Sequence, residues 1–419
     1  MTPRPPSRAL LMMTLIMGFA SGLPLALSSG TLQAWLTIEG VDLKTLGWLT
    51  VLGLPYTYKF GWAPLMDRFR LGGASAGRRK GWLVALQLGL AGVLLLISLS
   101  ENVQTPEGLW RLASLAFLLV ILSASFDIVF DAWRAESLRP EDRGLGAAWS
   151  VIGYRLAMLT SGGLALMLAD LYLGFQGTYR VMAGLCTIMA IVAIVAPEPS
   201  TARPPTTLRE AVVEPFREFF SRGGAWWLLA GIILYKLGDA FAGSLSTAFL
   251  IREMGFSAAE VGAVNKGMGL LATLVGGLAG GWWLSRLGLW RALLVFGVGQ
   301  ALTNIGFWWL ATNPASLTSM TLVILLENLA GGMGTAAFVA LLMALCDIRF
   351  TATQFALLSA LASIGRVWVG PVAGTAVTDY GWPLFFLGSF AAALPGLWLI
   401  WRLRAIIDRA DQSEPASSQ

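Results

Sequence analysis

Two carboxylates stand close together in a stretch that is otherwise apolar. Asp127 and Asp131 lie near the end of an apolar run that begins near Trp110. Because they are four residues apart, they share one face of a helix. A carboxylate costs at least about 3 kcal/mol to hold in hydrocarbon, so Asp127 is expected to face a protein interior or a water-filled path. Such a pair favours a route for a solute or for protons over a packing device.

The composition identifies the surroundings of this pair. The chain has 419 residues, of which 56% are hydrophobic and 13% are charged, whereas soluble proteins carry about 25% charged residues. The apolar runs reach the roughly 20 residues that cross a bilayer as a helix. With no histidine in the chain, a proton relay must use carboxylates and the commonest metal ligand is missing. We expect a multi-span helical protein in a lipid bilayer, with no metal, no cofactor and no nucleic-acid partner.

Twelve apolar runs are long enough to cross a membrane. They begin near Leu10, Lys44, Trp82, Trp110, Leu145, Tyr179, Ala225, Ser257, Trp290, Thr318, Thr353 and Trp382. An even number places both termini on one side. With the N-terminus inside, 20 of the 29 basic residues fall in cytoplasmic segments and four in external ones. The excess of positive charge on the inner side predicts that both termini are cytoplasmic.

The two halves of the chain carry similar motifs. Asp42 and Ser257 each follow a short external turn, are predicted to cap a helix, and precede a glycine by five residues. Arg155 and Arg366 recur in the middle of the fifth and eleventh helices. In each of these matches, the residue in the second half lies slightly more than about 210 positions after its counterpart in the first half. A parallel repeat of six helices is the plan of the major facilitator fold, in which the solute site lies between the halves at the midplane.

The sequence therefore predicts an all-α membrane protein with the major facilitator fold, whose 12 transmembrane helices form two six-helix halves. The predicted parts are an N-terminal half at 1–196, a cytoplasmic linker with an amphipathic helix at 197–224, a C-terminal half at 225–405 and a cytoplasmic tail at 406–419.

The loop between the second and third helices carries charges that are typical of that superfamily. Asp67 and Arg68 are followed by the basic residues Arg78 and Arg79. In the superfamily such loop charges contact an acid at the inner end of the fourth helix, and Asp131 is placed for that role. We call Asp67, Arg68, Arg78, Arg79 and Asp131 the cytoplasmic latch.

Eight further charged residues fall inside the predicted helices. They are Lys59, Asp127, Arg155, Lys236, Asp239, Lys266, Glu327 and Arg366. Helices 1, 4, 7 and 10 line the cavity in this fold, and four of the eight charges lie on that set: Asp127, Lys236, Asp239 and Glu327. Five positive and three negative charges leave a modest cationic excess, which suits a solute with carboxylates or phosphates. The three acids can also take up protons.

Other interpretations of these charges stay open. Lys236 and Asp239 are three residues apart and could only neutralise each other, and Arg155 and Arg366 could equally be structural. Lys59 lies near a helix end, where its ammonium can reach the interface, so we assign no function to it.

Small residues flank several of the charges. Gly331 and Gly334 share a face with Glu327, and Gly18 and Gly22 lie along one stripe of the first helix. They could leave a path uncovered, or they could simply let helices pack closely.

Several stretches resemble the AmpG-type muropeptide permeases. The matching stretches are 18–27, 31–35, 127–133, 153–166, 234–241, 327–334 and 352–360. They lie in both halves and on most helices. The resemblance implies a permease of the bacterial inner membrane that imports anhydromuropeptides, which are sugar-peptide fragments of the cell wall. Import from periplasm to cytoplasm with protons would serve wall recycling and the signalling that induces β-lactamase, a route to antibiotic resistance.

The resemblance and the charges together suggest roles for individual residues. Asp127 is the first candidate for proton coupling, followed by Asp239 and Glu327. A second set would bind the substrate, the cations holding peptide carboxylates and the amides holding sugar or amide groups: Gln33, Arg155, Lys236, Asn265, Lys266 and Arg366. We expect a monomer.

Two rival functions remain. A proton-antiport exporter of the same fold would favour a cavity with acids alone, which five embedded basic residues oppose. A membrane sensor or enzyme acting on cell-wall sugars would need catalytic residues on sizeable loops. The longest loop is only about 28 residues, at 197–224, and no phosphate-binding glycine loop occurs. We therefore predict no catalytic residues and no enzyme activity.

Overall fold

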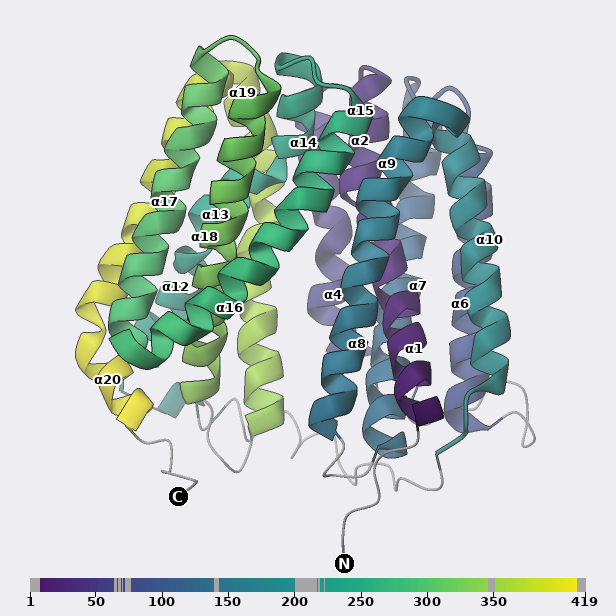
Figure 1. Cartoon of the computed structure of the whole chain (residues 1–419), viewed down its shortest axis with the longest axis horizontal. Helices are drawn as coiled ribbons and strands as arrows, with labels where there is room; N and C mark the ends of the chain where they lie inside the picture. Colours follow the sequence, from purple (N-terminus) through teal and green to yellow (C-terminus); the bar gives the residue numbers. More distant parts are fainter. Residues whose placement is uncertain are drawn as a thin grey trace, which may run out of the picture. The chain divides into compact units, whose positions relative to one another are not determined.

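The computed structural model of the chain describes residues 8–63, 66, 69, 71, 77–138, 143–199, 217, 219–221, 223–345 and 351–412. Within these ranges every regular element is a helix (Figure 1). In the same part of the chain, nine helical stretches are long and apolar enough to cross a membrane. The all-α class that the composition predicts is confirmed. The amphipathic helix predicted at 197–224 lies mostly outside the described residues.

Two of the nine stretches are long enough to cross a membrane twice. Trp149–Val195 has 47 residues and Leu358–Arg402 has 45, whereas one crossing takes about 20. Each contains a glycine with a backbone conformation that interrupts a helix, because Gly174 has a φ of 65° and Gly381 a φ of 76°. Both glycines lie close to predicted helix boundaries. The count of twelve crossings stays a prediction.

The chain divides into two compact units. Unit 1 comprises Met1–Val41, Leu52–Pro204 and Ser257–Lys266, and unit 2 comprises Asp42–Val51, Pro205–Phe256 and Gly267–Gln419. The units differ from the predicted halves because Asp42–Val51 and Ser257–Lys266 each belong with the opposite half. We call these two the exchanged segments. They are the two N-cap motifs that the sequence repeat had matched to each other.

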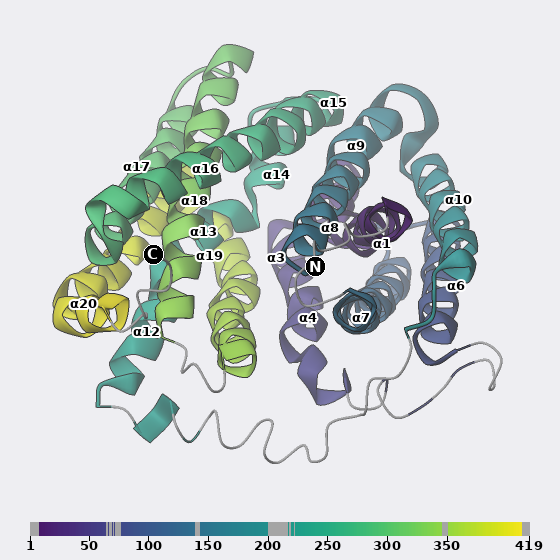
Figure 2. The same ribbon diagram turned by 60° about the horizontal axis from the view of Figure 1, so that its bottom comes forward.

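Unit 1 has a buried core around Phe126, Phe130 and Trp133. Figure 2 shows its helices α6 and α10 side by side. The helices of unit 1 are α1 (Arg8–Leu27), α2 (Gly30–Ile38), α4 (Leu54–Tyr58), α6 (Arg78–Ser98), α7 (Pro106–Ser137), α8 (Arg143–Met158), α9 (Ala165–Leu168), α10 (Gly174–Val195) and α15 (Ala258–Val261), with π-helical turns at Leu159–Leu164, Ala169–Leu173 and Gly262–Met268, the last of which ends just inside unit 2.

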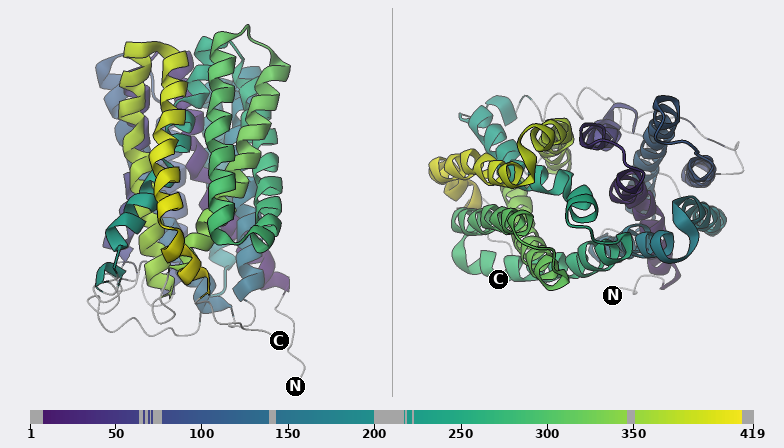
Figure 3. Two further views of the ribbon diagram at one scale, coloured as in Figure 1. Left: turned by 90° about the vertical axis from the view of Figure 1, so that its left-hand side faces the viewer. Right: turned by 90° about the horizontal axis from the view of Figure 1, so that it is seen from above.

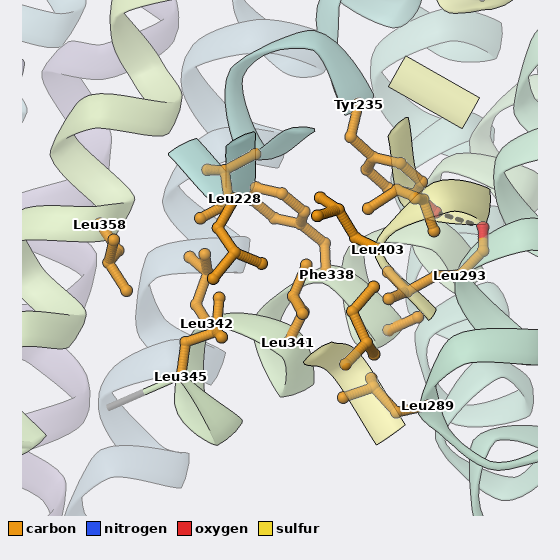
Figure 4. Packing of buried hydrophobic residues seen from close by; sticks show 14 of the residues in the cluster. Leu228, Tyr235, Leu289, Leu293, Phe338, Leu341, Leu342, Leu345, Leu358 and Leu403 are labelled. Carbon is orange, nitrogen blue, oxygen red and sulfur yellow. Dashed lines mark hydrogen bonds between the residues drawn. The ribbon is translucent and has the colours of Figure 1, made fainter. Parts of the chain in front are cut away.

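Unit 2 has its own buried core, which Figure 4 shows. In Figure 3 the last helix, α20, continues the chain beyond α19 at one end of the unit. The helices of unit 2 are α3 (Leu43–Trp48), α12 (Ala225–Tyr235), α13 (Leu237–Ser244), α14 (Ser246–Ala248), α16 (Gly269–Leu287), α17 (Leu289–Thr312), α18 (Leu317–Ala344), α19 (Thr351–Arg402) and α20 (Arg404–Gln412), with a π-helical turn at Phe249–Glu253.

The glycines of α1 bring it close to α8. A Cβ on Gly22 would come within 2.7 Å of the Tyr154 carbonyl oxygen, and one on Gly18 would overlap the backbone of Ser150. Gly153 approaches the backbone of α1 from the other side. Gly18 and Gly22 therefore pack two helices together. They do not open a path, which was one of the two interpretations of this stripe.

Contacts of the same kind hold the first exchanged segment in unit 2. A Cβ on Gly47 would overlap the backbone of Gly370. Next to it, the Thr50 hydroxyl donates a hydrogen bond of 2.7 Å to the Val367 carbonyl oxygen. The predicted N-cap at Asp42 is confirmed, since its side chain accepts a hydrogen bond from the Thr45 amide.

The second exchanged segment is held in unit 1. A Cβ on Gly262 would come within 2.8 Å of the Gly163 carbonyl oxygen. The Asp170 carboxylate accepts a hydrogen bond of 2.9 Å from the Ala259 amide at the start of α15. The predicted N-cap at Ser257 is confirmed, with a full capping box formed by Ser257 and Glu260.

A buried ion pair joins α6 to the end of α7 in unit 1. The Arg79 guanidinium donates two hydrogen bonds to the Glu136 carboxylate, at 2.6 and 3.2 Å, and its side chain is 4% exposed. The Glu198 carboxylate accepts hydrogen bonds from the Arg79 and Lys80 amides, so it caps the start of α6.

Arg79 thus has a partner outside the predicted latch, and the latch itself stays a prediction. Glu136 can pair with Arg79 because α7 continues beyond Asp131 as far as Ser137. Asp131 is exposed and pairs with Arg134 on its own helix at 3.0 Å. Asp67 and Arg68 lie outside the described residues, as does the side chain of Arg78.

Arg79→Ala should destabilise the protein strongly. Removing one partner of a buried ion pair costs about 3–5 kcal/mol, because the remaining charge stays in a poorly solvated site. Thermal unfolding of the purified protein in detergent measures the loss. Arg134→Ala is the matched control, since an exposed pair contributes about 1 kcal/mol or less. Equal losses in the two variants would contradict the role given to Glu136.

Candidate functional site

Asp127 lies half-buried on α7 in unit 1. The Ser21 hydroxyl of α1 donates a hydrogen bond of 2.5 Å to its Oδ1. One turn before it, the Ser123 hydroxyl accepts a hydrogen bond of 2.7 Å from the Tyr56 phenol. Ser21 can reach Asp127 because α1 packs against α7. The described hydrogen-bond partner of this carboxylate is thus a neutral hydroxyl.

Two charges act on Asp127, one from another segment of unit 1 and one from its own helix. The strongest is Lys59, and Asp131 opposes it. The sequence had suggested only that Lys59 reaches the interface, because its distance from Asp127 in space was not visible. Lys59 belongs to the interrupted helical region after Pro55, a residue that has no amide hydrogen to donate. The structure therefore brings Lys59 into the electrostatic surroundings of Asp127.

Arg155 of α8 has an incomplete set of partners. Its Nη1 lies 3.8 Å from the Met158 sulfur, and its buried Nε has no hydrogen-bond partner among the described residues. The charge of Arg155 acts on the neighbouring Tyr154 phenol, as does that of Asp127. A guanidinium whose buried N–H group has no described partner can donate a hydrogen bond from that group to a carboxylate or phosphate.

Lys266 and Asn265 lie in the second exchanged segment and so belong to unit 1. The Lys266 Nζ is 3.1 Å from the place that a Cβ on Gly30 would take, at the break between α1 and α2. On its other side, Lys266 approaches Gly162 in the π-helical turn after α8. Gln33 of α2 is buried. The glycine at position 30 leaves room for the lysine ammonium, whereas a Cβ at position 162 would make an ordinary contact with the lysine side chain.

Lys236 and Asp239 meet in unit 2, where the helix is interrupted. Lys236 has a non-helical ψ of 1° between α12 and α13. Its ammonium lies 3.5 Å from the Asp239 carboxylate and 3.3 Å from the Thr335 hydroxyl of α18. Asp239 also accepts a short hydrogen bond from the Gln300 amide of α17. Three helices therefore contribute to one network around a lysine that is only 8% exposed.

The core of unit 2 fixes the base of this network. The Tyr235 ring stacks on Phe338 with 5.6 Å between centroids, and its hydroxyl donates a hydrogen bond to the Leu293 carbonyl oxygen (Figure 4). The Lys236 ammonium lies 5.8 Å and 6.0 Å from the two ring centroids. These distances allow cation–π attraction. The stacked rings thus position Lys236, which directly follows Tyr235 in the chain.

Glu327 and Arg366 complete the charged set of unit 2. The charges of both act on Lys236. Glu327 accepts a hydrogen bond of 2.7 Å from the Asn328 amide, which in turn is bonded to Thr273 of α16. Arg366 is exposed. The structure therefore groups Lys236, Asp239, Glu327 and Arg366 in unit 2, and Gln33, Asp127, Arg155, Asn265 and Lys266 in unit 1.

Gln300, Thr335 and Ser21 are part of these networks, although they were not among the residues predicted from the sequence. Gln300 had a signal, because it and Asn304 are polar residues four apart in the apolar helix α17. No sequence pattern indicated Thr335 or Ser21, since isolated hydroxyls in membrane helices usually form a hydrogen bond with the backbone of their own helix.

The two sites carry groups that are suited to holding ions. In the described part of the chain, no three His, Cys, Asp or Glu side chains gather as metal ligands. Unit 1 offers an isolated carboxylate and a guanidinium with a spare donor, and unit 2 offers a lysine held by neutral and acidic partners. Such groups can bind an anionic solute and take up a proton.

The helical fold and these embedded charges define a membrane transporter. Residues 9–368 match the Major Facilitator Superfamily, and the chain belongs to that superfamily. It is 55% identical to the anhydromuropeptide permease of Escherichia coli K12, over 94% of this chain and 79% of that protein. It is also 36% identical to the putative transporter AmpG 4 of Rickettsia conorii, over 94% of this chain and 96% of that one. The resemblance to AmpG-type permeases is confirmed.

Solved transporters share the fold at low sequence identity. A bacterial homologue of the human lysosomal transporter Spinster, inward-facing and unoccupied, matches with a TM-score of 0.76 and 15% identity, covering 99% of this chain and 100% of that chain. The nucleoside transporter NupG matches with a TM-score of 0.68 and 13% identity, covering 94% of this chain and 99% of that chain. These matches support the major facilitator fold and say nothing about the solute.

Gly334→Ala should break the hydrogen bond between Gln300 and Asp239. A Cβ at this position would overlap the Gln300 amide, whereas one at Gly331, one turn away on α18, has its nearest neighbour at 4.0 Å. We expect Gly334→Ala to lose about 1–3 kcal/mol of stability and most transport activity, and Gly331→Ala to behave as wild type. Thermal unfolding and uptake measure both. Wild-type behaviour of Gly334→Ala would show that Gln300 is dispensable.

Proposed function

We propose that this chain is a proton-coupled importer of anhydromuropeptides, carrying them from periplasm to cytoplasm. The observation that carries this proposal is the 55% identity to the Escherichia coli anhydromuropeptide permease across 94% of the chain. In this proposal the protein is a monomer of the bacterial inner membrane, with both termini in the cytoplasm, no enzyme activity and no cofactor besides the proton. Import would supply wall recycling and the signal that induces β-lactamase.

The charges support a solute with several carboxylates. Lys236, Lys266, Arg155 and Arg366 offer cations in both units, and desolvating an anion requires such cations nearby. Arg155 has a buried donor without a described partner. In the proposal, the four cations hold the peptide carboxylates. Gln33 and Asn265 hydrogen-bond to sugar or amide groups.

In this proposal, the Asp127 carboxylate binds and releases the coupled proton. Its described partner is the Ser21 hydroxyl, which can donate to the ionised carboxylate and can also accept a hydrogen bond from the protonated one. Asp239, by contrast, is held by the Lys236 ammonium, which can only donate to it, and also accepts a hydrogen bond from Gln300. Asp127 is therefore better suited to change its protonation state during transport. Asp239 and Glu327 are the second candidates.

Uptake by proteoliposomes tests the whole proposal. Purified protein is reconstituted, and accumulation of labelled anhydromuropeptide is followed with and without an inward proton gradient. We expect accumulation only with the gradient. Equal uptake under both conditions would mean facilitated diffusion, and no uptake of this solute would reject the proposed substrate.

Asp127→Asn should abolish accumulation driven by the gradient while substrate binding persists, because Asn cannot carry the proton but can still bond to Ser21. The measurements are uptake and equilibrium binding on the same preparation. Asp131→Asn is the matched control, four residues away on the same helix and paired with Arg134. Gradient-driven accumulation by Asp127→Asn at the wild-type level would remove Asp127 from the mechanism.

A double variant separates the two interpretations of Lys236 and Asp239. If they only neutralise each other, Lys236→Ala alone should be inactive and the pair Lys236→Ala with Asp239→Ala should recover. If Lys236 binds the solute, the double variant stays inactive. We expect the second result, with binding weakened about tenfold to hundredfold, because a hydrogen bond to a charged group contributes about 1.5–3 kcal/mol. Recovery of uptake by the double variant would reduce the pair to a structural one.

A further inference from the structure

Three arginines at one end of unit 2 lie over tryptophan rings. The Arg286 guanidinium carbon is 3.6 Å from the Trp282 ring centroid, and that of Arg404 is 4.4 Å from Trp290. The third pair is Arg402 over Trp398, at 5.2 Å. Figure 1 shows α20, which begins at Arg404, beside the ends of the neighbouring helices of this unit. Tryptophan and arginine gather where a membrane helix meets the lipid headgroups.

One of the three pairs also lines a cavity. A pocket of about 190 Å³ is bounded by Trp227 near the start of α12 and by Trp398, Leu399, Arg402 and Leu403 at the end of α19. Trp227 is 61% exposed and Trp398 is 49% exposed. The pocket thus joins a cation to two tryptophan rings and two leucines, at the point where two membrane-spanning helices reach the same surface.

The cation in this pocket has no acidic partner in the described part of the chain. Arg404, two residues further on, pairs with Asp408 at 3.3 Å, but no carboxylate lies within ion-pair distance of Arg402 among the residues that the structure describes. A guanidinium held against an aromatic ring keeps its in-plane donors available. It is suited to bind a phosphate with two hydrogen bonds.

We propose that this pocket binds the headgroup phosphate of an anionic phospholipid. Arg402 contacts the phosphate, the Trp227 and Trp398 rings lie at headgroup level, and Leu399 and Leu403 contact the start of the acyl chains. Basic pockets between membrane helices on the cytoplasmic side bind such headgroups. Placement in the inner leaflet follows the cytoplasmic orientation of the proposed function. The binding itself depends on neither the solute nor proton coupling.

Thermal unfolding of the full chain in detergent tests this site. We measure the unfolding temperature with cardiolipin, phosphatidylglycerol, phosphatidylcholine or inorganic phosphate. A ligand that binds only the folded state raises this temperature. We expect both anionic lipids to stabilise the wild type by several degrees, whereas phosphatidylcholine and inorganic phosphate have little effect. An equal response to phosphatidylcholine would remove the role of charge, and an equal response to phosphate would point to a free anion.

Arg402→Gln should lose about half or more of the stabilisation by cardiolipin. Arg286→Gln is the matched control, because Arg286 also lies over a tryptophan but does not line the pocket, and it should respond as the wild type does. Native mass spectrometry of the same samples should find one fewer bound lipid in Arg402→Gln only. Identical responses and lipid counts in the two variants would overturn the proposal, whatever the outcome of the uptake assays.

Discussion

The ammonium of Lys236 is buried in a membrane-spanning stretch, where an unpaired charge is costly to hold. Much of the geometry around it in unit 2 serves to satisfy that one group. The helix is interrupted at Lys236, Asp239 supplies the counter-charge, and Thr335 accepts from the ammonium. Gly334 leaves the space in which Gln300 reaches Asp239. The network lies on the stacked rings of the hydrophobic core, so packing and charge placement are not separable here.

Unit 1 holds its charges more loosely. Asp127 is bonded to a hydroxyl, and Arg155 keeps a buried donor without a described partner. The strong ion pair of this unit, between Arg79 and Glu136, lies instead at the ends of α6 and α7. Rigid charge pairing is thus placed where helices must be joined, and weaker pairing is placed deeper in the membrane. A site that exchanges protons and anions requires groups whose present partners can be replaced.

The sequence predicted well whatever depends on local patterns. Apolar runs located the helices, and the caps at Asp42 and Ser257 followed from side-chain chemistry within one turn. Contacts between segments that are distant in the chain could not be predicted from the sequence. Glu136 was not predicted as a partner of Arg79, because two acids lie near that helix end and the sequence does not give their distances from Arg79. Gln300 was missed because its importance comes from Asp239, which lies on another helix. The glycines of α1 were ambiguous for the same reason.

The exchanged segments set an order in which the protein can be assembled during synthesis. The Asp170 carboxylate cannot accept its hydrogen bond until an amide 89 residues further along the chain has been synthesised. The Thr50 hydroxyl cannot donate its hydrogen bond until a carbonyl oxygen 317 residues further along the chain has been synthesised. A chain that has been synthesised only as far as residue 204 has therefore made most of unit 1 without the Ala259 amide that Asp170 contacts. Unit 1 cannot be completed before Ser257–Lys266 has been synthesised, and the contact of Thr50 in unit 2 cannot form before Val367 of α19 has been synthesised.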